Sequence, residues 1–166
     1  MEKKLAKYIT LVALISSLLS FGFVSVPVFA RVPDNRVTTC FVKAELWTTI
    51  PWTTPPTELP LSLEICASGS PHLLIGAGTM YDPACGRSII MVTGCINGHS
   101  LTLTGQIIKG IDTPQLKGTP IKLEADLKTG NMILTFGPIS PGLPLSGLTF
   151  VFTGTGLVSV KPQALA

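Results

Sequence analysis

Four cysteines and two histidines carry the most reactive side-chain chemistry in this chain of 166 residues. If the N-terminus is a secretory signal, an even number of cysteines predicts disulfides, because oxidising compartments favour them. In an up-and-down meander of strands, a first turn near residues 52–54 places Cys40 opposite Cys66, within disulfide distance. The sequence therefore predicts a Cys40–Cys66 disulfide and leaves Cys85 to pair with Cys95, although a pure meander separates this second pair.

The same meander brings His72 and His99 to the end of the sheet that holds Cys40, Cys66 and Cys95. A shared rim of cysteine and histidine side chains could bind a metal ion. However, the chain has no C-x-x-C spacing, and disulfide formation competes for the thiols. We therefore expect neither a metal nor a cofactor, and a metal site at His72 and His99 is the alternative.

Motifs of known catalytic sites are absent from the sequence. It contains no G-x-S-x-G, no H-E-x-x-H, no Walker A loop and no EF-hand pattern. Most of the titratable residues lie beside turn residues, where a solvated polar side chain is expected. The sequence therefore favours a protein that is not an enzyme. The residues that could still act as acids or bases are His72, His99, Asp82, Asp112, Glu45 and Glu64.

The aromatic residues Trp47, Trp52 and Tyr81 are the candidates for ligand binding. Aromatic rings provide stacking faces for sugars, prolines and apolar ligands, and the neighbouring threonines could donate hydrogen bonds. The alternative is that the two tryptophans cover the core at one end of the fold, because large aromatic side chains usually pack on the core.

Residues 1–30 have the three parts of a secretory signal: an N-terminus with three lysines, an apolar run from residue 9 to residue 24, and small residues before a cleavage point. We expect cleavage after Ala30, and an uncleaved membrane anchor is the alternative. The segment holds three of the 12 basic and one of the nine acidic residues, so nine basic and eight acidic residues remain after cleavage. The net charge then falls from +3 to +1.

Beyond the signal, apolar and polar residues alternate with a period of two, which is typical of strands with one face on a core and one in water. Asn97-Gly98 between two such runs predicts a hairpin with a type I′ turn, whose two central residues need a positive φ. The expected strands are residues 36–47, 59–66, 73–81, 88–96, 101–107, 121–127, 132–136 and 148–153, the last with a continuation to residue 160.

This pattern predicts a single all-β domain over residues 31–166, an antiparallel barrel of about eight strands, with a two-sheet β-sandwich as the alternative. The chain has no cluster of lysines and arginines of the kind that binds nucleic acid. An outer-membrane barrel would also alternate, but it needs girdles of aromatic residues that this chain is too poor in aromatics to supply. We therefore do not expect an integral membrane protein after cleavage.

These features favour an extracytoplasmic, non-catalytic barrel, whether secreted, periplasmic or at the cell surface, that binds a small apolar or carbohydrate ligand. The alternatives are a cell-surface structural or assembly subunit and a small secreted hydrolase. An open apolar interior would favour ligand binding, and a filled interior with an exposed strand edge would favour assembly. A histidine beside a carboxylate in a cleft would favour catalysis.

Overall fold

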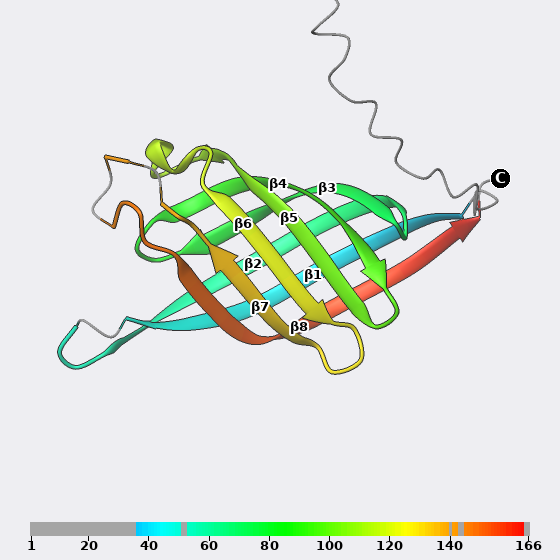
Figure 1. Cartoon of the computed structure of the whole chain (residues 1–166), viewed down its shortest axis with the longest axis horizontal. Coiled ribbons are helices and arrows are strands. Elements are labelled where there is room, and N and C mark those ends of the chain that lie inside the picture. Colours follow the sequence, from blue (N-terminus) through cyan, green and yellow to red (C-terminus); the bar gives the residue numbers. More distant parts are fainter. Residues whose placement is uncertain (1–35, 51–52, 140, 143–144, 165–166) are drawn as a thin grey trace, which may run out of the picture. The chain divides into compact units, whose positions relative to one another are not determined.

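The structure, a computed structural model, describes residues 36–50, 53–139, 141–142 and 145–164, so the predicted signal segment and Trp52 lie outside the described residues. Eight antiparallel strands follow one another round a closed barrel, and β1 returns to pair with β8 (Figure 1). This confirms the predicted antiparallel barrel. The elements are β1 (Arg36–Ile50), β2 (Thr57–Ser70), β3 (Leu73–Asp82), β4 (Gly86–Asn97), β5 (Ser100–Gly110), the 3₁₀ helix η1 (Pro114–Leu116), β6 (Pro120–Asp126), β7 (Asn131–Phe136) and β8 (Phe150–Ala164).

The interior of the barrel is filled by apolar side chains. Inward and outward residues alternate along the strands, with a register shift where β4 pairs with β5, and the inward apolar residues of all eight strands form one buried cluster. Leu116 of η1 and Ile139 of the β7–β8 loop join this cluster. Burying one such side chain stabilises the fold by about 1.5–3 kcal/mol, so the filled interior is the main source of stability. Among the described residues, no helix is long and apolar enough to cross a membrane.

Inward-facing glycines let neighbouring strands approach one another closely. A Cβ atom added at Gly76, Gly94 or Gly105 would lie less than 3.0 Å from backbone atoms of the adjacent strand, and the same holds at Gly154 and Gly156 of β8. Glycine inside a strand is typical of tight bends where a sheet curls into a barrel. The first group spans β3–β5 and the second lies beside β1, so we infer that the sheet bends most sharply in these two regions.

The register of β1 against β2 differs from the predicted register by one residue. Cys40 is opposite Ala67, and Cys66 is opposite Phe41. A shift of one residue moves a side chain to the other face of the sheet. Cys40 is therefore buried in the core, whereas Cys66 is exposed on the outer face.

The two predicted disulfides, Cys40–Cys66 and Cys85–Cys95, are not formed in the structure, where all four cysteines are free. The register explains the first pair, because its two side chains lie on opposite faces of the sheet. Strand geometry explains the second. Cys85 precedes β4 and Cys95 lies near the far end of this extended strand, about 33 Å away along the chain.

The β4–β5 hairpin turns one residue later than predicted. Asn97 pairs with Ser100, so the two central residues of the turn are Gly98 and His99. Of these two, only Gly98 has a positive φ, at 59°. This is the pattern of a type II′ turn rather than the predicted type I′ turn. As a result, His99 lies at the tip of the hairpin.

The substitution Gly94→Ala tests the role of close strand approach. The new Cβ would lie within 3.0 Å of Leu103 Cα and of the Thr102 carbonyl oxygen, so we expect the free energy of unfolding to fall by about 1–3 kcal/mol. Urea unfolding followed by circular dichroism measures the change. Thr79→Ala, at an exposed outward position of β3, is the control and should cost less than about 1 kcal/mol. Equal stability of the two variants would contradict the packing argument.

Candidate functional site

A hollow with a mixed polar and apolar lining lies on the outer surface where the β4–β5 turn meets the β6–β7 turn. Its volume is about 390 Å³. Two apolar residues, Ala125 and Ile133, and six polar residues line it. The polar residues are Asn97, His99, Ser100, Glu124, Asp126 and Asn131.

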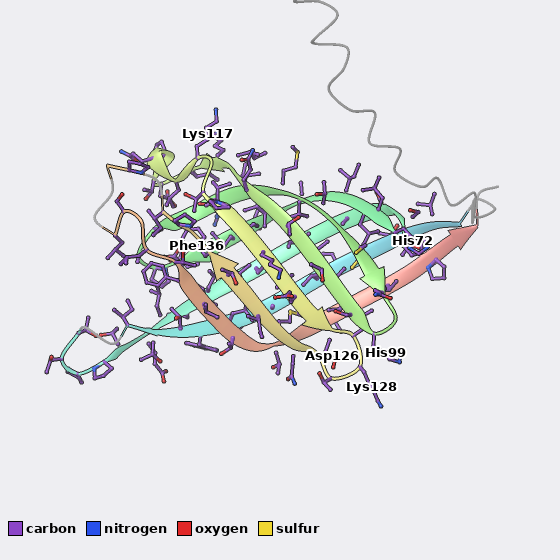
Figure 2. All side chains as sticks on the ribbon, in the orientation of Figure 1. His72, His99, Lys117, Asp126, Lys128 and Phe136 are labelled. Atoms are coloured by element: carbon purple, nitrogen blue, oxygen red, sulfur yellow. The ribbon has the colours of Figure 1, made fainter. Side chains whose placement is uncertain are left out.

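The pairing of β5 with β6 explains why residues from two separate hairpins share this hollow. The ladder runs to its last pair, Ser100 opposite Asp126, and then continues into the turns through a hydrogen bond in which the Leu127 N–H donates to the His99 carbonyl at 2.7 Å. Figure 2 shows His99, Asp126 and Lys128 at this end of the barrel. The barrel register therefore brings an imidazole and a carboxylate to the same place.

Asp126 is held in place by its own turn. Its Oδ1 accepts the backbone N–H groups of Lys128 at 2.7 Å and Thr129 at 3.2 Å. These hydrogen bonds, with a smaller contribution from nearby His99, lower the pKa of Asp126 below its ordinary value. The hollow therefore contains a fixed, ionised carboxylate at neutral pH.

The second carboxylate of the hollow, Glu124, forms an ion pair with Lys122 on the same strand, with 3.0 Å between Nζ and Oε1. Both side chains are about half exposed to solvent. A second hollow, of about 440 Å³, lies over β4, β5 and β6, but no charged side chain lines it. The hollow at the two turns therefore has the greater capacity for specific polar recognition.

Of the three aromatic candidates, Trp47 and Tyr81 lie within the described residues and do not enter the core. Trp47 and Tyr81 are 47% and 48% exposed and lie on the outer face. Trp47 is opposite Pro60 and Tyr81 is opposite Ser62, so the two aromatic residues sit in neighbouring rows on either side of β2. The alternative in which Trp47 covers the core is therefore wrong. Trp52 cannot be placed with them, because it lies outside the described residues.

The histidines lie in different turns at the same end of the barrel (Figure 2). His72 is exposed in the β2–β3 turn, and His99 is exposed in the β4–β5 turn. In the described part of the chain, no group of three or more His, Cys, Asp or Glu residues is arranged to hold a metal ion. The alternative metal site at His72 and His99 therefore gains no support from the structure.

A second group of reactive side chains lies at the β3–β4 turn. Asp82 is buried, and its Oδ1 accepts the N–H groups of Ala84 at 2.9 Å and Cys85 at 2.7 Å. Burial raises the pKa of Asp82. Burial and the nearby Asp82 charge raise the pKa of Cys85 to about 11, so its thiol stays protonated at neutral pH. A protonated thiol is a poor nucleophile, so Cys85 is not suited to nucleophilic catalysis. The hydrogen bonds that Asp82 accepts stabilise the β3–β4 turn.

Most of the hollow was not predicted from the sequence. Of its lining residues, only His99 was a candidate, whereas Glu124, Asp126, Asn97 and Asn131 were not. The available signal was the break between the expected strands 121–127 and 132–136, which the meander places at the same end of the barrel as the Asn97-Gly98 turn. Comparisons with known protein families, with curated proteins and with solved structures found no match.

The opposite pKa shifts of Asp82 and Asp126 predict opposite dependences of stability on pH. Asp82 binds its proton more tightly in the folded state than in the unfolded state. Its contribution to the free energy of unfolding therefore falls as pH rises from the ordinary aspartate pKa of about 3.9 through the raised pKa of the folded state. The contribution of Asp126 is present above the ordinary value and is lost as pH falls through its lowered pKa.

We therefore expect Asp82→Asn to make stability rise more steeply with pH above about 4, and Asp126→Asn to make it rise less steeply below about 4. In Asp82→Asn, a side-chain oxygen remains to accept the two turn N–H groups. Urea unfolding of the wild type and both variants between pH 2.5 and pH 7 (about the range where carboxylates titrate) measures the slopes. Changes of the same sign in both variants would contradict the assignment.

The cysteines should differ in reactivity. Burial, with the nearby Cys66, raises the pKa of Cys40 to about 11. In native protein at pH 8 we expect iodoacetamide to modify exposed Cys66 at least about tenfold faster than Cys40 or Cys85. Mass spectrometry of digested peptides measures the rates, and unfolded protein, in which all four should react, is the control. If Cys66 reacts only after reduction, the free-thiol arrangement does not hold in the purified protein.

Proposed function

We propose that this chain is an extracytoplasmic, non-catalytic β-barrel module that binds a carbohydrate or similar polyhydroxylated ligand in the hollow around His99 and Asp126. The observation that carries the proposal is that polar side chains from two hairpins converge on this outer hollow. Its volume lies at the lower end of the range typical of small-molecule sites, about 300–1,000 Å³.

The packing of the barrel directs the proposal to the outer surface. A ligand inside the barrel would have to displace buried residues such as Leu46, Leu103 and Phe152, which are at most 2% exposed. Removing packed side chains of this kind costs about 2–5 kcal/mol each. Binding in the outer hollow does not require that cost.

The chemistry of the hollow suits a ligand with several hydroxyl groups. Carboxylates accept hydrogen bonds, side-chain amides both donate and accept them, and a neutral imidazole does both. Ile133 adds one apolar contact for a C–H face. A polyhydroxylated ligand could therefore satisfy these groups without burying any of them unpaired.

The carboxylates of the hollow favour binding over catalysis. A general acid or base works best when its pKa lies near the working pH. The pKa of Asp126 is lowered instead, because its oxygen accepts turn N–H groups. Glu124 is already paired with Lys122. These features support recognition rather than proton transfer.

The predicted secretory signal supports a location outside the cytoplasm. The alternation of side chains supports a barrel that works in water after cleavage. Charged pairs such as Lys43–Glu64, with 2.8 Å between Nζ and Oε1, lie on the outer face in the middle of the strands, while the interior is apolar. A barrel in a lipid bilayer has the opposite arrangement, with an apolar outer band.

The experiment is titration of the exported protein with a panel of soluble oligosaccharides by calorimetry. His99→Ala removes the ring from the hollow but keeps the carbonyl that accepts the Leu127 N–H. We expect it to weaken binding of a positive oligosaccharide at least about tenfold, which corresponds to 1.4 kcal/mol. His72→Ala, in the neighbouring turn, is the control and should bind as the wild type does.

Two results would contradict the proposal. One is that no oligosaccharide of the panel binds to the folded protein. The other is that His99→Ala and His72→Ala bind equally well, which would place the ligand elsewhere. Chromatography of the bound oligosaccharide after prolonged incubation tests the non-catalytic part, because the appearance of shorter saccharides would indicate hydrolysis.

A further inference from the structure

Strand β8 has a long edge that is not paired within the described chain. On one side it pairs with β1 as far as Ala164, but on the other side its last partner in β7 is Asn131, opposite Thr155. Figure 1 shows β8 continuing beyond β7 with β1 on one side only. The stretch after Gly156 therefore has one free edge, and free edges can pair with further strands.

One hydrogen bond establishes which backbone groups face this edge. The Gly156 N–H donates to the Gly130 carbonyl at 3.0 Å, on the β7 side. In an antiparallel strand the N–H and C=O of one residue point to the same side, and successive residues alternate. Val158 and Val160 therefore direct their N–H and C=O groups to the free edge, whereas Leu157 and Ser159 direct theirs to β1.

The free edge ends at Lys161-Pro162. Proline has no N–H to donate, so Pro162 cannot continue a ladder as a donor. The segment Leu157–Val160 is uncharged and rich in β-branched residues. Leu157 is 64% exposed and Val160 is 37% exposed. The free edge thus offers two donors and two acceptors beside exposed apolar side chains.

We propose that this edge pairs with the same edge of a second copy of the chain, antiparallel and about a two-fold axis at Ser159. The alternation of backbone groups allows this register. Val158 then faces Val160 of the second copy, and both residues direct their N–H and C=O groups across the contact. Four hydrogen bonds form between the two copies. Ser159 of one copy faces Ser159 of the other as a non-hydrogen-bonded pair.

The charges also permit a second copy as the occupant. In this register Lys161 faces Leu157 of the other chain, so the two lysines lie at opposite ends of the contact. The processed chain has a net charge of only +1, so two copies repel one another weakly. No residue of this edge lines the ligand hollow, and the pairing would make the protein an assembly subunit as well as a binding module.

The first test is sedimentation equilibrium of the exported protein and its variant Val160→Pro. Proline at this position removes an N–H that points to the free edge and leaves the hydrogen bonds between β8 and β1 in place. We expect a dimer for the wild type and at least tenfold weaker dimerisation for the variant. Val160→Thr keeps the N–H and is the control, which should dimerise as the wild type does.

The second test does not depend on a proline being tolerated. In a non-hydrogen-bonded antiparallel pair the Cα atoms are about 4.5 Å apart, within disulfide range. In a Cys66→Ser background, which removes the exposed thiol, Ser159→Cys should form a covalent dimer on mild oxidation with diamide. Thr155→Cys, on the same strand but opposite Asn131, is the control and should remain monomeric.

A wild-type protein that is monomeric up to its solubility limit would overturn the proposal and would leave the edge to a different partner. So would equal cross-linking of Ser159→Cys and Thr155→Cys. If Val160→Pro loses its β-sheet circular dichroism spectrum, the cross-linking result decides. The variant His99→Ala should dimerise normally, so failure of the proposed ligand site and failure of this contact can be distinguished.

Discussion

Close approach of backbones at inward-facing glycines is the constraint on which this barrel depends. At Gly76, Gly94 and Gly105, and again at Gly154 and Gly156, the neighbouring strand occupies the space that a Cβ atom would need. A sheet that bends this sharply can close with eight strands around side chains alone. The glycines therefore determine both that the barrel closes and that its interior is small enough to be filled.

A filled interior leaves only the outer surface for the proposed ligand site, and the two ends of the barrel differ in the side chains they expose. At one end, η1 and the β7–β8 loop contribute Leu116 and Ile139 to the core, and buried Asp82 holds the adjacent β3–β4 turn. At the other end the turns are tight, so polar residues at the strand ends face solvent. The hollow around His99 and Asp126 is the product of this second arrangement.

The period-two alternation predicted about eight antiparallel strands, because it depends only on which residues must leave water. It favoured a barrel but left a two-sheet sandwich as the alternative, and the pairing of β1 with β8 decides for the barrel. Details that turn on a single residue were not predictable in the same way. The register of β1 against β2 differs by one residue from the predicted register, and this placed Cys40 and Cys66 on opposite faces. Likewise, only Gly98 of the predicted Asn97-Gly98 pair took a positive φ. The hollow forms where two hairpins meet. Alternation along a single strand predicts which face of that strand is buried, but not which hairpins lie next to one another.

The stagger of the strands links the hollow to the free edge of β8. Strands in a closed barrel tilt and shift relative to one another, so partners of unequal length cannot end together. Here β7 has six residues and β8 has 15, and β7 begins just after the turn that holds Asp126. Because β7 is short, the β6–β7 turn lies beside the β4–β5 hairpin, and the two turns together form the hollow. For the same reason, β8 beyond Gly156 has no partner on its β7 side within the described chain. A longer β7 would cover the free edge and move the β6–β7 turn away from the β4–β5 hairpin, so the short β7 accounts for both surfaces.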